Sequence, residues 1–310
     1  MSTLNKKPNL DNLQDLSASL QLIRMKRKQR DEVERGILLQ QLSSICTYVI
    51  LVVISLSVLL PFIWLVSASL KDEFQYFAVP MRWFPQPILW SNYSEIFTEY
   101  NFLHYILNSL WIALTAVFIS TLSSALIAYG FARFRFPGRT ALFIVVLATM
   151  MMPTQMQTIP LYILFRQLGW VDTFLPLLVP QLFGSALNIF LFRQFFIVLP
   201  RELDEAAKID GSGSLRIFWA IILPQSRSVL VVVALFTFLA SWQDTLRPLI
   251  YLSSDANRTV PLGLLFFDNP VHSVDPQLMA ATLVALAIPV ILYTLGQRSI
   301  DSGVTRLKRT

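Results

Sequence analysis

Residues 48–66 read YVILVVISLSVLLPFIWLV, a stretch with no aspartate, glutamate, lysine or arginine. A helix needs about 20 mainly apolar residues to cross the hydrocarbon core of a bilayer. The uncharged window around the stretch runs from Gly36 to Leu70, which is too long for the apolar region of a cleaved signal peptide. The residues before it are also too polar for one. We therefore predict an uncleaved signal-anchor helix and a fold that is set by the membrane.

The composition of the whole chain favours a membrane protein. Of its 310 residues, 55% are hydrophobic and only 14% are charged, whereas soluble domains carry about 25% charged residues. A soluble globule could not hide so much apolar surface, and a disordered chain would be more polar. With one cysteine, Cys46, and two histidines, the sequence excludes an intramolecular disulfide and a His/Cys metal cluster.

Five further windows are long and apolar enough to cross a bilayer, so we predict an all-α integral membrane protein with six transmembrane helices. Prolines inside the third and fourth windows are tolerated because neighbouring helices can satisfy the freed carbonyls. The fifth window is the softest, because it crosses Asp244 and Arg247. The five windows lie between His104 and Arg133, between Arg139 and Arg166, between Asp172 and Arg193, from Ile217 or Arg227 to about Tyr251, and between Asp275 and Arg298.

The basic residues predict the orientation of these helices. Twenty of the 25 lysines and arginines fall on one side, in residues 1–44, 131–140, 193–228 and 298–310. Cytoplasmic loops carry the excess of basic residues, so both termini are expected in the cytoplasm. The basic cluster within residues 24–30 is then either a solvated topology signal or a contact with anionic lipid. The five basic residues on the outer side are Lys71, Arg82, Arg166, Arg247 and Arg258.

The predicted spans divide the chain into four segments. Residues 1–41 form a cytoplasmic tail, and residues 42–106 hold the first transmembrane helix and an external loop. Residues 107–298 form a five-helix core, and residues 299–310 form a second cytoplasmic tail.

Several mechanisms are disfavoured by what the spans lack. Ion-coupled transporters usually place ionisable groups inside the membrane, but only the fifth span holds any, Asp244 and Arg247. Three residues apart, these two could pair at the interface or line a path. No phosphate-binding G-x-x-x-x-G-K-[ST] loop occurs in the chain. His104 and His272 fall in predicted outer loops, where we expect solvated side chains rather than a catalytic site.

The cytoplasmic loop between the fourth and fifth spans is the most informative segment. Residues 199–225 read LPRELDEAAKIDGSGSLRIFWAIILPQ. Pro200 suits a first turn, acidic residues follow where the helix dipole favours them, and Gly211 is a natural stop. We therefore predict a short helix from Arg201 to Asp210, followed by a second helix capped by Ser214.

One face of this short helix would carry Leu203, Ala206 and Ala207, spaced i, i+3 and i+4. Paired alanines allow another surface to approach closely. Physical reasoning alone also permits an amphipathic hairpin lying on lipid.

The spacing in this loop resembles the EAA loop of the permeases of ABC importers. The matching residues are Glu205-Ala206-Ala207, Asp210-Gly211 and, nine residues on, Ile221-x-Leu223-Pro224. Other segments resemble the same family, so that the likeness covers roughly residues 45–305. The closest subgroup is similar to the second permease subunit of maltose-type sugar transporters. The further matching segments are Phe134–Arg139, Pro160–Tyr162, Phe192–Phe196, Phe238–Asp244, and Gln297-Arg298 with Gly303.

The resemblance implies a type I ABC importer permease fold with a coupling loop at residues 197–225. Glu205 would contact a separate ATPase or cap its own helix, and Ala206 and Ala207 would form the docking face. Asp210 and Gly211 would form the turn, and Leu223-Pro224 would set the entry into the fifth span.

The resemblance also implies partners. These are a second, different permease subunit, two ATPase subunits that bind ATP and Mg, and a solute-binding protein on the outer side, where residues 71–104 and 253–276 offer docking loops. The chain itself would bind no cofactor, catalyse no reaction and contact no nucleic acid. It would lie in the cell (inner) membrane as a multi-pass subunit.

A substrate path is expected near the outer end of the fifth span, where Trp242, Gln243, Asp244, Arg247 and Tyr251 offer aromatic faces and hydrogen-bonding groups suited to sugars. Packing against the partner permease is the competing interpretation. The sequence departs from the family pattern at Ala240, Gln243 and Arg247, which puts the substrate in question.

The predicted function is therefore a permease subunit of an ATP-driven, binding-protein-dependent sugar importer. A permease for a polyol or a glycerol phosphate is the main alternative, although Arg247 alone is not an arginine clamp for phosphate. An ion-coupled secondary transporter and a membrane enzyme or scaffold are less consistent with the sequence.

Overall fold

The computed structural model describes residues 40–41, 43–267 and 275–307, and over these residues it contains helices, turns and bends but no strand. The all-α prediction is confirmed. The described residues divide into two compact units, with the boundary between Trp64 and Leu65. Most of the predicted tail 1–41, and His272, lie outside the described residues.

The first predicted span forms a continuous helix from Ser43 to Ser69, and none of its most apolar window is buried within the chain. The prediction of a spanning helix is confirmed by its length and hydropathy. Because an exposed apolar helix of this length is unstable in water, its natural surroundings are lipid.

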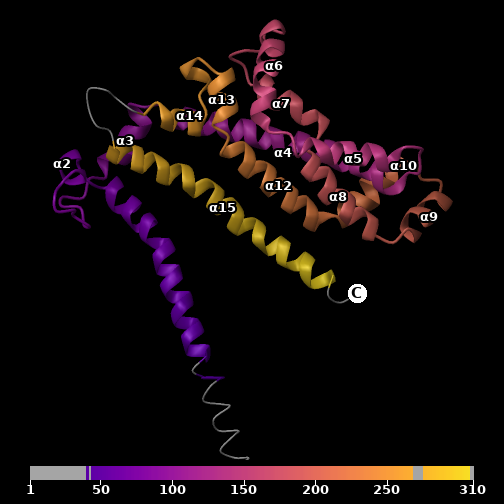
Figure 1. Cartoon of the computed structure of the whole chain (residues 1–310), viewed down its shortest axis with the longest axis horizontal. Helices are drawn as coiled ribbons and strands as arrows, with labels where there is room; N and C mark the ends of the chain where they lie inside the picture. The colour runs from indigo at the N-terminus through magenta and orange to yellow at the C-terminus, as the bar shows by residue number, and fades with distance from the viewer. Residues whose placement is uncertain (1–39, 42, 268–274, 308–310) are drawn as a thin grey trace, which may run out of the picture. The chain divides into compact units, whose positions relative to one another are not determined.

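The body of the larger unit is built on α4, Phe102–Arg133, which packs against α8, Ala186–Val198, and α12, Arg227–Trp242. A fourth helix, α15, Asp275–Leu307, packs on α12 (Figure 1). This helix continues past residue 299, where the second tail was predicted to start.

Small residues on α4 explain the close packing of these helices. Every fourth residue along one face is alanine or serine, and all of them are buried. Small side chains at this spacing let helix backbones approach closely, which is how helices associate in a membrane without a hydrophobic driving force. The residues of this stripe are Ala116, Ser120, Ser124, Ala128 and Ala132.

The third predicted span is not one helix. It forms α5, Arg139–Thr149, and α6, Thr154–Gln167. Pro153 stands at the N-cap of α6, where its fixed φ and missing N–H end one helix and suit the start of the next.

The fourth span runs through α7, Leu175–Leu178, the 3₁₀ turn η1, Val179–Phe183, and α8.

The fifth span is bent by 83° between residues 214–225 and 227–242. The first part consists of α10, Ser214–Ile217, the π-helical turn η2, Phe218–Ile222, and α11, Leu223–Gln225. Such π-turns interrupt the regular hydrogen-bond ladder and often occur at helix kinks.

Among the described residues, four helices are long and apolar enough to cross a membrane, and a fifth span follows if the bent pair is counted as one. The count of six therefore stays a prediction, because its third span is divided between α5 and α6.

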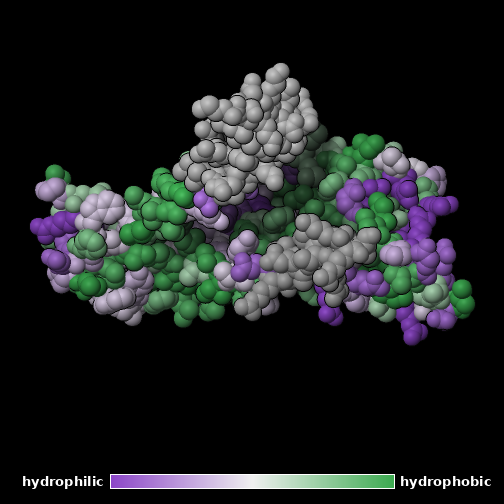
Figure 2. Space-filling model, turned by 90° about the horizontal axis from the view of Figure 1, so that it is seen from below, coloured by the Kyte–Doolittle hydropathy of each residue, from purple (hydrophilic) through white to green (hydrophobic). Residues whose placement is uncertain are grey.

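Short helices lie at one end of this unit. They are α2, Glu73–Tyr76, α3, Ser91–Thr98, α13, Leu246–Tyr251, the 3₁₀ turn η3, Asp255–Asn257, and α14, Val260–Leu265. At the other end lie α5, α10 and α9, Glu202–Ile209, where hydrophilic residues gather on the surface (Figures 1 and 2). The predicted positive side of the membrane corresponds to this second end.

Candidate functional site

The predicted cytoplasmic loop contains the short helix expected from the sequence. Helix α9 spans Glu202–Ile209, one residue shorter at each end than predicted. No side chain caps its N-terminus, but Glu202, Asp204 and Glu205 lie in its first turn. Negative charges there offset the positive end of the helix dipole and replace the missing cap.

Gly211 ends α9 with a Schellman motif. Its φ of +77° lies in the left-handed region, which glycine adopts without steric cost. The Ser212 amide donates to the carbonyl of Ala207 at 2.9 Å, and the Gly211 amide donates to the carbonyl of Lys208 at 3.0 Å. These two bonds satisfy carbonyls that a helix end would otherwise leave unpaired. The predicted stop is confirmed.

The two faces of α9 have different surroundings. Asp204 and Ala207 are each 7% exposed and face the body of their own chain, where Ala207 joins a hydrophobic cluster with Phe192 and Phe196. Glu205 and Ala206 are exposed, and Ile209 is 87% exposed. The exposed face of α9 is therefore narrower than the docking face expected from the sequence. Ala207 packs inward, and of the two alanines Ala206 is the exposed one.

An ion pair holds α9 against the end of α4. The Arg133 Nε lies 3.2 Å from a carboxylate oxygen of Asp204, and the two side chains are only 4% and 10% exposed. The Arg133 Nη2 also donates to the carbonyl of Leu199 at 3.1 Å. Tyr129, one helical turn earlier, donates its hydroxyl to the carbonyl of Ser214 at 3.2 Å. Thus one turn of α4 is tied to residues on both sides of the loop helix.

The sequence analysis did not identify this pair. Arg133 was counted only as a positive-inside residue, and Asp204 only as one of three acids in a first turn. Their opposite charges were visible, but 71 residues separate them along the chain. Nothing in the local pattern indicated that they meet.

One detail of the loop differs from expectation. Gly213, rather than Ser214, is the N-cap of α10, and Ser214 makes no capping hydrogen bond because it is already the first helical residue. Leu223 and Pro224 precede the bend of the fifth span. The buried Ser226 marks the bend, and its hydroxyl donates to the carbonyl of Ile222 at 2.6 Å.

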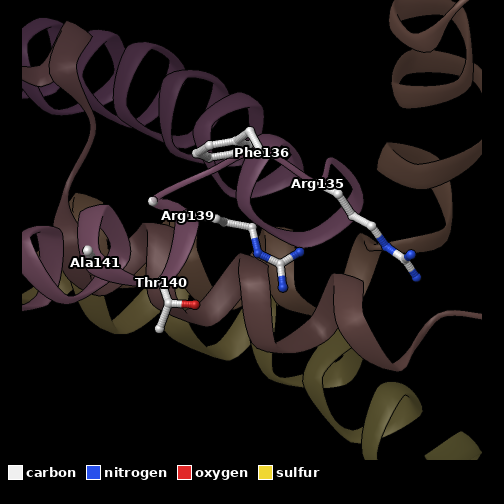
Figure 3. A pocket seen from close by; sticks show the side chains of 6 residues that line it. Arg135, Phe136, Arg139, Thr140 and Ala141 are labelled. Atoms are coloured by element: carbon white, nitrogen blue, oxygen red, sulfur yellow. The ribbon is translucent and has the colours of Figure 1, made fainter.

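The Phe134–Arg139 segment forms the turn between α4 and α5. Four of its residues, Arg135, Phe136, Gly138 and Arg139, line an open hollow of about 340 Å³ together with Thr140 and Ala141. The side chains of Arg135 and Arg139 extend to the same side of the turn (Figure 3). Arg139 donates to the carbonyl of Phe134 at 3.1 Å, which stiffens the turn.

The residues expected in a substrate path have different surroundings. Trp242 is 4% exposed and stacks on Phe238, and Tyr251 is 3% exposed and packs edge-on against Phe165. Both rings are covered by their own chain, which favours a packing role for them. Gln243 is exposed.

Asp244 and Arg247 pair, as the spacing allows, and the Arg247 side chain is 40% exposed. They lie in and just after the break between α12 and α13.

At the end of the unit that lies away from α9, Asp172 joins segments that are far apart in sequence. One of its carboxylate oxygens accepts the backbone amides of Ser253 and Ser254, each at 2.9 Å, and its own amide donates to the carbonyl of Tyr251 at 2.7 Å. These hydrogen bonds to the charged form lower the pKa of Asp172 to about 2.

His104 was expected in a solvated loop but lies in the first turn of α4. Its side chain is exposed, and its Nε2 lies 2.6 Å from the carbonyl oxygen of Ala256. Within the described parts of the chain, no group of three or more histidine, cysteine, aspartate or glutamate side chains could hold a metal ion.

Comparisons with known proteins agree with this architecture. The chain is 34% identical over 268 residues to the sn-glycerol-3-phosphate transport system permease protein UgpE of Yersinia pestis bv. Antiqua (strain Antiqua), covering 83% of this chain and 94% of that protein. It is 31% identical to the maltodextrin transport system permease protein MdxG of Bacillus subtilis (strain 168), covering 86% and 96%. It is also 31% identical to the diacetylchitobiose uptake system permease protein NgcG of Streptomyces coelicolor (strain ATCC BAA-471 / A3(2) / M145), covering 84% and 87%.

The fold is similar to a chain of a bacterial ABC transporter involved in the import of the acidic polysaccharide alginate, with a TM-score of 0.75 and 21% identity, covering 83% and 96% of the two chains. Residues 121–306 match the family model described as the inner membrane component of binding-protein-dependent transport systems. With this match and the curated permeases, the chain belongs to the family of binding-protein-dependent transport system inner membrane components.

Proposed function

We propose that this chain is a permease subunit of an ATP-driven sugar importer and that it docks a separate ATPase through the exposed face of α9. The observation that carries the proposal is the division of α9 into two faces. Its inner face is tied to α4 by the Arg133–Asp204 pair, and its outer face presents Glu205, Ala206 and Ile209. A free apolar side chain beside a small one suits insertion into a cleft on a partner.

The geometry gives α9 a mechanical role. Because Arg133 ends α4, a push on α9 would act directly on a helix that packs against both α8 and α12. The Schellman turn at Gly211 then keeps α9 at a fixed angle to the segment that enters the bent fifth span. ATP binding and hydrolysis supply the driving force on the partner ATPase, and this chain converts it into movement of its own helices.

The other partners follow from the family. A second permease subunit would complete the translocation path, two ATPase subunits would act on the two permeases, and a solute-binding protein would deliver the solute from outside. The exposed apolar surface of the Ser43–Ser69 helix leaves room for lipid or a partner.

A phosphorylated polyol is the second candidate class of solute, because the UgpE relatives are named for sn-glycerol 3-phosphate. Two other relatives are named for saccharides, diacetylchitobiose and maltodextrin. The charges of the described residues favour a sugar over a phosphorylated solute. The described residues place Arg247 against Asp244, so its charge is offset before a phosphate arrives.

Co-purification tests the proposal. The tagged chain, extracted gently from its membrane, should bring with it an ATPase and a second multi-span chain. Ala206→Asp should remove the ATPase because it places a charge in the centre of the docking face. Ser94→Asp, at an exposed position on α3, is the matched control and should retain it. A chain that purifies alone and moves solute in vesicles without ATP would overturn the proposal.

A further inference from the structure

A half-open cavity with both polar and apolar walls lies among the membrane-spanning helices. It has a volume of about 190 Å³ and lies where α8 and α12 approach α4. Apolar side chains, Leu187, Phe236 and Ala240, form part of its wall. Its polar lining groups are Ser120, Gln181, Ser185, Asn188, Thr237 and Ser241.

Three of these groups form a buried hydrogen-bonded cluster. The side-chain amide nitrogen of Asn188 donates to the hydroxyl of Thr237 at 3.0 Å and to the hydroxyl of Ser120 at 3.2 Å. Asn188 is 4% exposed, Ser120 is fully buried and Thr237 is 8% exposed. The cluster thus joins α8, α12 and α4 at one point, with one member on each helix.

Interhelical hydrogen bonds of this kind also occur as simple packing contacts in membranes. Two hydrogen bonds need only three polar groups, whereas this cavity gathers six neutral ones. Polar groups in a bilayer are costly unless they are paired with one another or line a path or a ligand site. The surplus is therefore evidence for a wetted or ligand-binding site.

The charge at the cavity discriminates between solute classes. Among the described residues that line it there is no carboxylate, and the one charged side chain is that of Arg247. That guanidinium already pairs with Asp244, so the site offers little net charge to an anion. Amide and hydroxyl groups both donate and accept hydrogen bonds, as sugar hydroxyls do.

We propose that this cavity is a solute subsite for a neutral, hydroxyl-rich segment of the transported molecule, and that it discriminates against phosphate esters. Its volume is below the roughly 300–1,000 Å³ of complete small-molecule pockets, so it holds one part of the solute while the partner permease supplies the remaining contacts. The inference rests on the proposed function and assigns a solute class to it.

Cysteine labelling in the assembled transporter tests the site directly. Cys46 is the only cysteine, so Ser241→Cys in a Cys46→Ser chain places a single thiol in the cavity wall. Its reaction with a small water-soluble thiol reagent is timed with a saturating neutral pool (maltose, diacetylchitobiose and glycerol) and with a phosphate-ester pool (sn-glycerol 3-phosphate and glucose 6-phosphate). The matched control is Ser94→Cys in the same background, an exposed site on α3.

The neutral pool should slow labelling of Ser241→Cys at least about threefold, the phosphate pool should leave it unchanged, and neither should affect Ser94→Cys. Slowing by the phosphate pool alone, or by neither pool, would overturn the proposal. Each variant is first checked for co-purification with the ATPase. Loss of the ATPase from the unmodified chain would refute the proposed function, whereas a retained ATPase with unprotected labelling would refute only the subsite.

Two further variants sharpen the assignment. Asn188→Leu removes the central amide and should lower uptake of the neutral solute roughly tenfold, the effect of about one strong hydrogen bond. Thr282→Val is its control, because among the described residues the Thr282 hydroxyl bonds within its own helix, to the carbonyl of Leu278 at 2.7 Å. Asp244→Asn frees the charge of Arg247 and should raise uptake of sn-glycerol 3-phosphate. Unchanged selectivity in Asp244→Asn together with normal uptake by Asn188→Leu would contradict the subsite.

Discussion

The two ends of the larger unit are held together by different forces. At the end that carries α9, a nearly dry ion pair, Arg133–Asp204, joins helices that are distant in sequence. At the other end, the described ion pairs are local and more exposed, Asp244–Arg247 and Asp255–Arg258, each three residues apart. The long-range ties there are hydrogen bonds, made by Asp172 to residues 251–257 and by Tyr105, Asn108 and Ser109 of α4 to residues 255–260.

The difference has a physical consequence. A buried ion pair resists separation strongly, because pulling its partners apart leaves an unpaired charge in a low-dielectric place. A hydrogen bond contributes less, about 0.5–1.5 kcal/mol or about 1.5–3 kcal/mol to a charged group, and partly exposed ones exchange with water. The end proposed to receive force from an ATPase is thus the stiffer of the two, and the outer end can rearrange around a solute.

The largest effect is expected at the ion pair. Arg133→Ala or Asp204→Ala should lower the free energy of unfolding by about 3–5 kcal/mol, because each leaves one buried charge unpaired. ATP-driven uptake should fall much more than binding of the ATPase. The charge-swapped double variant, Arg133→Asp with Asp204→Arg, should recover part of the activity. Uptake equal to wild type in both single variants would show that the pair transmits nothing.

The second-largest effect is expected for Gly263→Ala, which should destabilise the end of the unit that carries α14. A Cβ at this position would overlap the ring of Tyr105, whose hydroxyl donates to Asp255 at 2.6 Å. Overpacking of this kind costs about 1–3 kcal/mol, which a thermal unfolding curve of the solubilised protein would record. Gly130→Ala is the matched control within α4, where an added Cβ meets nothing within 4 Å. A control variant that unfolds as early as Gly263→Ala would refute the steric explanation.

Gly211→Ala should have a smaller effect. A Cβ there meets nothing within 4 Å, so the cost is only that of a left-handed φ, about 1 kcal/mol. The expected result is a modest loss of co-purifying ATPase. Gly213→Ala, two residues on, has a φ of −71° and equally open surroundings, so it should retain the ATPase. Equal losses in both variants would mean that the Schellman turn is not the cause.

The smallest effect concerns pH at the outer end. The pKa of Asp172 is lowered from 3.8 to about 2. A lowered pKa stabilises the folded form above the unfolded pKa, and this contribution is lost as the pH falls from about 4 to about 2. Amide exchange at Ser253 and Ser254, corrected for its intrinsic pH dependence, should accelerate across this window. The Asp172→Asn variant should show no such step, and a step that persists in it would assign the transition to another group.

Much of the local structure could be predicted from the sequence. The apolar windows indicate a membrane protein because bilayer thickness sets the length of an apolar helix. Acidic residues followed by Gly211 predict α9 and its end, because dipole and capping effects act within a turn. The prediction of a single helix in the third window was wrong because Pro153 starts a new helix. The proline was a local signal of this break, but the prediction gave more weight to the hydropathy of the window.

Only the tertiary structure decided which faces and partners these elements use. It turns Ala207 inward, brings Arg133 to Asp204, covers Trp242 and Tyr251 with rings of their own chain, and gathers the polar lining around Asn188. The sequence by itself determined the membrane class, most of the apolar windows and the loop helix, because those depend on residues within a few turns of each other. The contacts across the body depend on how α4, α8 and α12 rotate when they pack, and hydropathy along the chain carries no record of that rotation.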